Sequence, residues 1–349
     1  MLDDGAALTF DRAIGEAIDR LICVEMRFSS GLPRGVIHRL YDAARAWQEE
    51  PLTTRAAEAL ARRIRPGDRV LVVTGAGAPP WLPFGETDGP LGAAAIARGL
   101  DIGLGAKPVL VSEERNLPAI VAATEGIGLA VLPMAWFEER SACATTDALL
   151  LGEEAGPASA RAILARHKPT AVVFVEKGGP NAKGVFHTIT GRGRSADVMA
   201  SAHVLAEEAR AAGILTIGIG DGGNEIGFGA VAEAVRDIQP FGRRCACPCG
   251  EGIATVVETD SLVVAAISNW GAYGVMAALA CALGDRHILH DAAAERRMLL
   301  RCVEKGAVDG ILGRLEPGVD GTTPESQEAM LTLLGNLVDN ALRAGQRSF

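Results

Sequence analysis

Short apolar runs rich in valine, isoleucine and leucine recur along the chain, separated by segments whose apolar residues follow helical spacing. Such runs are typical of buried strands, and we predict strands at 69–73, 108–112, 128–132, 170–175, 214–219 and 262–266. Alanine-rich amphipathic helices are predicted between them, at 91–100, 159–167, 196–212 and 270–283. This alternation predicts an α/β fold, with a mostly parallel sheet and helices on both of its faces.

Further helices are expected at both ends of the chain. Three precede the first strand, at 11–23, 36–47 and 53–65, and two follow the last strand, at 292–305 and 324–344. Because no linker rich in Pro, Ser or Gln divides the sequence, we expect one domain over 1–349, with the helical segment 1–66 packed on it. The triplet Val308-Asp309-Gly310 is echoed by Val319-Asp320-Gly321, which is too short to indicate a duplication.

Composition restricts the partners. The 349 residues include 34 Lys and Arg against 43 Asp and Glu, a formal net charge of -9, and this argues against nucleic acid. No apolar stretch reaches the roughly 18 residues of a spanning helix, and Met1–Asp4 do not begin a signal sequence, so no membrane association is expected. Seven scattered cysteines are typical of a reducing compartment, and we expect a cytoplasmic protein.

Glycine is in excess, at 42 residues, and much of it follows predicted strands, in the loops 74–77, 176–181, 220–225 and 268–271. Ligands of open parallel sheets bind outside the carboxyl ends of the strands, where such loops converge. The sequence therefore predicts a site at one edge of the sheet.

The string 218–229, Gly-Ile-Gly-Asp-Gly-Gly-Asn-Glu-Ile-Gly-Phe-Gly, is the strongest local motif. It differs from a dinucleotide fingerprint, because Asp221 and Glu225 would face the pyrophosphate, so no nucleotide is expected. Its oxygens suit Mg²⁺ or Mn²⁺, while glycine allows the backbone to approach a ligand. A turn in which Asp221 and Asn224 bond local N–H groups is an equal alternative.

Two other loops carry carboxylates. In 85–92, helix capping explains Asp88 and Pro90 but leaves Glu86 unexplained. In 175–178, Glu176 is a candidate metal ligand or proton carrier, whereas a surface ion pair is the simpler interpretation of Lys177.

Two further groups are candidate binding sites. Ser268 and Asn269 open a helix and either cap it or bind a substrate carboxylate. The run Cys245-Ala246-Cys247-Pro248-Cys249 lacks the paired spacing and the distant fourth ligand of a structural zinc site, so no zinc is expected.

Five motifs together resemble the D-glutamate cyclase-like family: 85–92, the loop starting at Glu176, 218–229, 260–274 and 303–310. They follow the family's order and span roughly residues 34–325. The resemblance implies an enzyme that closes free D-glutamate to 5-oxo-D-proline with loss of water. The loop 74–84 departs from the family's Thr-Gly-Phe type start, and Lys177 stands where arginine is more usual.

For this reaction we expect a Mn²⁺ or Mg²⁺ ion held by Asp88, Asp221 and Glu225 to act as a Lewis acid on the substrate carboxylate. Catalytic roles are expected for Glu86, Glu176 and Asp221, of which Glu86 or Glu176 would take the ammonium proton. The expected substrate-binding residues are Lys177, Gly222, Gly223, Asn224, Ser268 and Asn269.

Two alternatives remain open. A Mn²⁺- or Mg²⁺-dependent phosphatase would use the same acidic loops, and a non-catalytic protein that binds an acidic amino acid would need fewer carboxylates. The expected partner is a small anionic substrate, and the sequence allows a homo-oligomer without indicating one.

Overall fold

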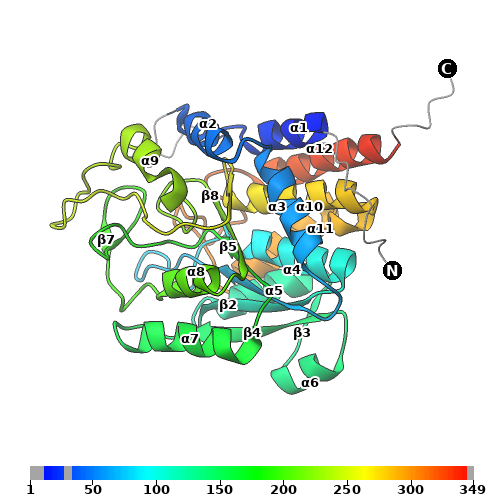
Figure 1. Cartoon of the computed structure of the whole chain (residues 1–349), viewed down its shortest axis with the longest axis horizontal. Helices are drawn as coiled ribbons and strands as arrows, with labels where there is room; N and C mark the ends of the chain where they lie inside the picture. Colours follow the sequence, from blue (N-terminus) through cyan, green and yellow to red (C-terminus); the bar gives the residue numbers. More distant parts are fainter. Residues whose placement is uncertain (1–11, 27–33, 344–349) are drawn as a thin grey trace.

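The computed structural model describes residues 12–26 and 34–343 (Figure 1). Residues 1–4 and 11, and residue 344, which enter the expectations above, lie outside this part. Within the described ranges, no helix is long and apolar enough to cross a membrane.

Seven parallel strands form the central sheet, in the order β3-β4-β2-β1-β5-β8-β9. A separate antiparallel pair, β6 with β7, lies outside it. The strand bounds are β1 Arg69–Thr74, β2 Lys107–Glu113, β3 Ala130–Val131, β4 Cys143–Leu149, β5 Ala171–Val175, β6 Phe186–His187, β7 Gly193–Arg194, β8 Leu215–Gly220 and β9 Ser261–Val264.

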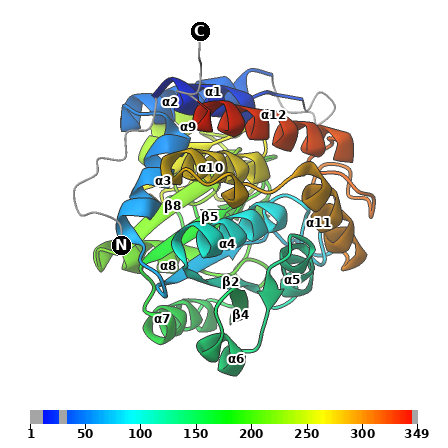
Figure 2. The same ribbon diagram turned by 90° about the vertical axis from the view of Figure 1, so that its right-hand side faces the viewer.

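Helices cover both faces of this sheet, which confirms the predicted α/β fold (Figures 1 and 2). Helices α4, α5 and α10 lie over one face, and α7 and α8 lie on the other (Figure 2). The helix bounds are α1 Arg12–Ile22, α2 Val36–Gln48, α3 Leu52–Arg63, α4 Pro90–Leu104, α5 Leu117–Gly126, α6 Met134–Glu139, α7 Ala155–His167, α8 Ala202–Ala211, α9 Ala232–Ile238, α10 Ser268–Leu283, α11 Ala292–Glu304 and α12 Pro324–Leu342, with short 3-10 turns η1 Gly229–Val231 and η2 Arg286–Ile288.

Strand β1 shows why an uninterrupted apolar run forms a central strand. Val70 and Val72 belong to the hydrophobic core under α4 and α10, whereas Leu71 and Val73 belong to the core under α7 and α8. Successive side chains of a strand point to opposite faces, so a strand covered on both sides must be apolar throughout.

Buried polar side chains fasten the N-terminal helices to the rest of the fold. The Asp19 carboxylate of α1 accepts hydrogen bonds from the N–H groups of Leu52 and Thr53 at the start of α3. The Gln48 side chain of α2 accepts from the Leu262 N–H and donates to the Leu262 carbonyl in β9. The helical segment is therefore attached to the β9 edge of the sheet through specific bonds as well as apolar packing.

Several predicted elements differ from the structure. The strand expected at 128–132 shortens to β3. Strand β4 is not among the predicted strands, because Thr145, Thr146 and Asp147 interrupt its apolar character. Asp147 is tolerated because it lies near the sheet edge, where it pairs with His167 and Arg166. The helix expected at 196–212 begins only at Ala202, after a turn whose Ala200 N–H donates to the Glu113 carboxylate.

A buried ion pair joins two strand ends. Lys177 Nζ, in the loop after β5, lies 2.6 Å from Glu113 Oε2 at the end of β2, and both side chains are almost fully buried. Burial raises the pKa of the Glu113 carboxyl, but attraction to Lys177 and several hydrogen bonds outweigh it and leave that pKa lowered.

Lys177→Met should lower the free energy of unfolding by about 3–5 kcal/mol at neutral pH, because it leaves the Glu113 carboxylate buried without its cation. A carboxyl with a lowered folded pKa stabilises the fold above its unfolded pKa, about 4.3, and this contribution is lost as the pH falls. The deficit of the mutant should therefore shrink towards pH 4 in urea denaturation.

Arg161→Met is the matched control, since it breaks the exposed pair between Arg161 and Glu208 and should cost less than about 1 kcal/mol. Equal losses in the two variants, or a Lys177→Met deficit that does not depend on pH, would contradict a stabilising role for the buried pair.

Candidate functional site

The strand order places a change of direction at the centre of the sheet. From β1 the chain proceeds to β2 on one side, and later returns to β5 on the other. The loops that follow β1, β5 and β8 contribute residues to one pocket at the carboxyl edge, with further residues from segments near 187–199 and 310–320. Such a switch point is where open α/β sheets bind ligands, because the adjacent loops separate there.

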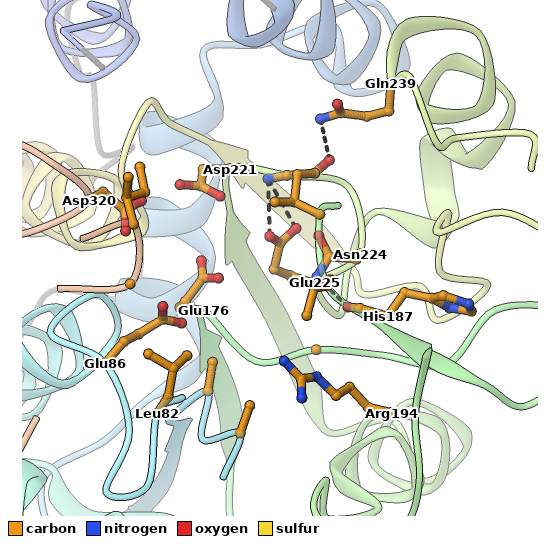
Figure 3. Close-up of a pocket in the computed structure, with 18 of the residues that line it drawn as sticks. Leu82, Glu86, Glu176, His187, Arg194, Asp221, Asn224, Glu225, Gln239 and Asp320 are labelled. Carbon is orange, nitrogen blue, oxygen red and sulfur yellow. Dashed lines mark hydrogen bonds between the residues drawn. The ribbon is translucent and has the colours of Figure 1, made fainter. Parts of the chain in front are cut away.

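A group of carboxylates lies at this edge. Asp88, Glu176 and Asp221 each offer an oxygen, and these oxygens lie within 4.8 Å of one another. Glu86 and Asp320 line the pocket together with Glu176 and Asp221 (Figure 3). We call these five residues the acidic cluster.

Across the cavity from the acidic cluster lie Arg194 and Asn224 (Figure 3). The cavity has a volume of about 200 Å³. Arg194 is half-buried, lies 5.2 Å from the centre of the Trp81 ring, and its Nε has no hydrogen-bond partner among the described residues. Burial, and then the neighbouring Arg192, lower the pKa of Arg194. The pocket thus has an acidic side and a cationic side.

Asp88 is held by the start of α10. Its carboxylate accepts from the N–H of Ser268 at 2.9 Å and from that of Asn269 at 2.8 Å, at the positive end of the helix dipole. Burial and then repulsion by Asp320 and Asp221 raise the pKa of Asp88 well above its usual value, in spite of these bonds.

Glu176 follows β5 directly and has a φ of 49°, a left-handed conformation that residues other than glycine rarely adopt. The Ser268 hydroxyl donates to its carboxylate. Burial, and then repulsion by Asp221, Glu225 and Asp88, raise the pKa of Glu176 well above its usual value. A strained backbone that holds one carboxylate close to other carboxylates is typical of a functional site.

Glu225 closes the glycine-rich loop instead of joining the three-carboxylate group. Its carboxylate accepts from the N–H groups of Gly222 and Gly223, at 3.0 and 2.7 Å. The loop turns back so tightly that a Cβ at Gly218 would lie 2.3 Å from the Ile226 carbonyl oxygen, which only glycine permits. Burial and Asp221 raise the pKa of Glu225 to about 8.

The metal-ligand group of the structure therefore differs in one member from the set expected from sequence, with Glu176 in the place of Glu225. Both residues carry a carboxylate in a loop after a strand, so composition alone does not separate them. The N–H donors that occupy Glu225 are visible only in the folded loop.

Lys177 lies outside the pocket, although the sequence suggests a substrate-binding role. Its ammonium donates to both oxygens of Glu113 and, at 2.9 Å, to the Gly75 carbonyl. All three N–H donors are used within the protein, so this lysine anchors the loop that carries Glu176.

Of the other expected substrate-binding residues, two line the pocket and three do not. Gly222 and Asn224 line the pocket. Ser268 and Asn269 are fully buried, and Asn269 Oδ1 accepts from the N–H groups of Gly89 and Gly92, which fixes the β1 exit loop against α10. Gly223 has a φ of 100° and donates its N–H to Glu225.

Sequence reasoning did not identify Arg194, Asp320 or Gln239, which also line the pocket. Asp320 belongs to the echoed Val-Asp-Gly triplet, and that echo was the available signal. Gln239 donates to the Gly222 carbonyl at 2.6 Å and supports the loop. Arg194 lies on a two-residue strand, for which the sequence carries no periodicity.

A second group of metal-ligating side chains lies nearby: His187, Cys245, Cys247 and Cys249. The expectation that no zinc binds rests on the assumption that the cysteines lack a distant fourth ligand. That assumption is wrong, because His187, from β6, supplies a ligand atom within 4.8 Å of the three sulfurs.

The raised pKa values of Glu86, Asp88 and Glu176 predict a dependence of stability on pH in metal-free protein. Burial, and then Asp320, Asp88 and Asp221, raise the pKa of Glu86. A carboxyl with a raised folded pKa contributes stability that is complete below its unfolded pKa, about 4.3, and is lost as the pH rises through the folded pKa.

Glu86→Gln keeps the shape of the protonated group but does not ionise. In urea denaturation with EDTA, the stability of this variant relative to wild type should therefore increase as the pH rises from about 5 to about 8. The exposed Glu114→Gln should show no such trend. A stability difference that stays flat across this range would show that Glu86 is not repelled by its neighbours.

Comparison with known proteins shows the family to which the chain belongs. The family model "D-glutamate cyclase-like, C-terminal" matches residues 37–335. Human mitochondrial D-glutamate cyclase is 42% identical over 98 residues, which are 28% of this chain and 14% of the human protein. The crystal structure of exonuclease RecJ bound to manganese covers 84% of this chain and 66% of its own, at 12% identity and a TM-score of 0.32, a similarity too low to support a conclusion. The chain belongs to the D-glutamate cyclase-like C-terminal family.

Proposed function

We propose that this protein cyclises free D-glutamate to 5-oxo-D-proline and water, with Mn²⁺ or Mg²⁺ held by Asp88, Glu176 and Asp221. Membership of the family supports the reaction class. The observation that carries the proposal is the division of the pocket, in which the acidic cluster faces Arg194 across a cavity of about 200 Å³ (Figure 3). An amino acid with two carboxylates and one ammonium group matches that distribution of charge.

The three carboxylates fit a hard divalent cation. Their oxygens lie close together, and no cysteine or histidine belongs to their group. Burial, and then repulsion by neighbouring carboxylates, raise the pKa of Asp88 and Glu176. Oxygen ligands of this kind favour Mn²⁺ or Mg²⁺ over softer ions. A cation bound there would supply Lewis acidity that makes the γ-carboxylate of the substrate a better electrophile.

Arg194 would bind the α-carboxylate. Its guanidinium points into the pocket opposite the acidic cluster (Figure 3). A planar guanidinium binds a carboxylate through two parallel hydrogen bonds, which fixes its orientation as well as its position. With the α-carboxylate held on this side, the γ-carboxylate extends towards the acidic cluster.

Glu86 would carry protons. The substrate nitrogen begins as an ammonium group with three protons and ends as a lactam N–H with one, and the two protons it loses leave with one γ-carboxylate oxygen as water. A carboxyl whose pKa is raised above its usual value can accept the first proton and return it to the departing oxygen. The new bond joins the nitrogen to the γ-carboxylate carbon, and the C–O bond to the departing oxygen breaks.

A metal-dependent phosphatase would use the same three carboxylates, because a cation between carboxylates also binds phosphoryl oxygens. A non-catalytic amino-acid binding protein would need Arg194 but no group of three carboxylates. The number of carboxylates in the acidic cluster therefore favours catalysis over binding alone.

Metal-free protein supplied with Mn²⁺ should convert D-glutamate to 5-oxo-D-proline, measured by chiral chromatography beside L-glutamate and an aryl phosphate. Asp221→Asn should reduce turnover by about 100-fold or more and require far more Mn²⁺, while changing stability by no more than about 1 kcal/mol. The exposed Asp42→Asn is the control and should retain full activity.

Each contrary outcome has a distinct meaning in this assay. Hydrolysis of the aryl phosphate with unchanged glutamate would identify a phosphatase, and binding of glutamate without turnover would identify a binding protein. Full activity of metal-free protein in EDTA would remove the Lewis-acid role.

Arg194→Ala should raise the KM for glutamate about 10- to 100-fold with a smaller effect on kcat, because charge-assisted hydrogen bonds to the α-carboxylate are lost. Arg194→Lys should fall between wild type and Arg194→Ala, since lysine keeps the charge without the paired geometry. Steady-state kinetics with Arg161→Ala as the control would test this, and an unchanged KM would exclude Arg194 from substrate binding.

A further inference from the structure

Three cysteines and one histidine gather beside the pocket. Cys245, Cys247 and Cys249 lie in the segment between α9 and β9, and His187 lies on β6. The Cys245 sulfur is 3.4 Å from that of Cys247 and 3.3 Å from that of Cys249. His187 Nε2 is 3.3 Å from the Cys247 sulfur and 3.6 Å from the Cys249 sulfur.

We propose that these four side chains bind one zinc ion as a structural Cys3His site. In a tetrahedral site with Zn–S bonds of about 2.3 Å and a Zn–N bond of about 2.0–2.1 Å, ligand atoms are separated by about 3.6–3.8 Å. The separations between the sulfurs and the imidazole nitrogen are close to these values. Four ligands complete the coordination of the ion, as in sites that stabilise a fold.

The imidazole of His187 is oriented as a metal ligand requires. Its Nδ1 lies 3.0 Å from the Val185 carbonyl oxygen, which can only accept a hydrogen bond, so Nδ1 carries the proton. Nε2 then directs its lone pair at the sulfurs. Metal-ligating histidines typically donate their other ring N–H to a carbonyl or carboxylate in this way. The Asn181 side chain also donates towards the Cys249 sulfur, at 3.5 Å.

Other uses of these cysteines fit the geometry less well. The three thiols are all free, and their separations exceed the disulfide bond length of about 2.05 Å. One disulfide would also leave an unpaired third cysteine beside His187. Sulfur and imidazole ligands select zinc over Mn²⁺ or Mg²⁺, so this site and the acidic cluster would take different ions.

The site would hold one wall of the pocket. Between Ile238 and Ser261 the chain forms no helix or strand of the sheet. The four ligands join this segment to the 181–194 segment, which carries the pocket-lining His187 and Arg194. The Ala246 N–H donates to the Gly191 carbonyl at 2.9 Å, and the His187 carbonyl accepts from Asn224 Nδ2 at 3.0 Å. A zinc ion would therefore fix the position of Arg194 relative to the glycine-rich loop.

Elemental analysis of the full-length protein, purified under reducing conditions and freed of loosely bound ions, tests the proposal. We expect one zinc per chain, released in proportion when an organomercurial reagent titrates the thiols. Cobalt added to the zinc-depleted protein should give the thiolate charge-transfer and tetrahedral absorption bands. Cys247→Ser should lower zinc content at least tenfold, whereas Cys281→Ser, a half-buried cysteine on α10, should leave it unchanged.

His187→Cys keeps four ligands and should retain zinc. This variant still gives a readout if Cys247→Ser fails to fold. Asp221→Asn should keep its zinc, so failure of the proposed cyclase activity leaves this result unaffected. The proposal would be overturned if wild-type protein holds no zinc and gives no cobalt spectrum, or if it contains a disulfide among these cysteines. It would also be overturned if Cys281→Ser loses as much zinc as Cys247→Ser.

Discussion

Repulsion among buried carboxylates at the carboxyl edge of the sheet is the constraint on which the site depends. Three of these carboxylates are held in place by donors that the fold supplies. Asp88 accepts from the N-terminal N–H groups of α10, Glu176 accepts from the Ser268 hydroxyl, and Glu225 accepts from its own loop. These bonds offset burial only in part, since the pKa of each of these carboxyls remains raised. A divalent cation among Asp88, Glu176 and Asp221 would remove the remaining cost, so binding of the cation and order in these loops are linked.

The opposite wall determines which molecules suit the pocket. Arg194 stands across from the acidic cluster, and its guanidinium is partly withdrawn from water beside Trp81. A ligand with charge of one sign would satisfy only one side of such a pocket. An acidic amino acid presents an ammonium group and two carboxylates within a few bonds, and it can satisfy both sides together.

The two metal-ligand groups have different chemistry and different places in the fold. The acidic cluster uses oxygen ligands from the ends of strands, whereas His187 and the three cysteines lie on segments outside the sheet. Such a division would let the Mn²⁺ or Mg²⁺ and the zinc that we propose bind at separate sites. His187 connects the two, because it lines the pocket and also offers its imidazole to the sulfurs.

The sequence by itself determined the fold class and the edge of the sheet at which the site lies. Uninterrupted apolar runs specify strands covered on both faces, and glycine and carboxylates directly after those runs indicate loops that approach a ligand. Local patterns also identified most of the acidic residues. They did not identify β4, because Thr145, Thr146 and Asp147 break its apolar pattern at the sheet edge.

Only the tertiary structure decided which of these residues act together. In the folded protein Lys177 pairs with Glu113, and the Glu225 carboxylate accepts hydrogen bonds from its own loop. Glu176 lies beside Asp88 and Asp221. The tertiary structure also brought Arg194 into the pocket and set His187 against Cys247, 60 residues further along the chain. Periodicity indicates which side of a helix or strand is buried. The partner of a polar side chain depends instead on how distant segments pack, and local sequence patterns do not encode that packing.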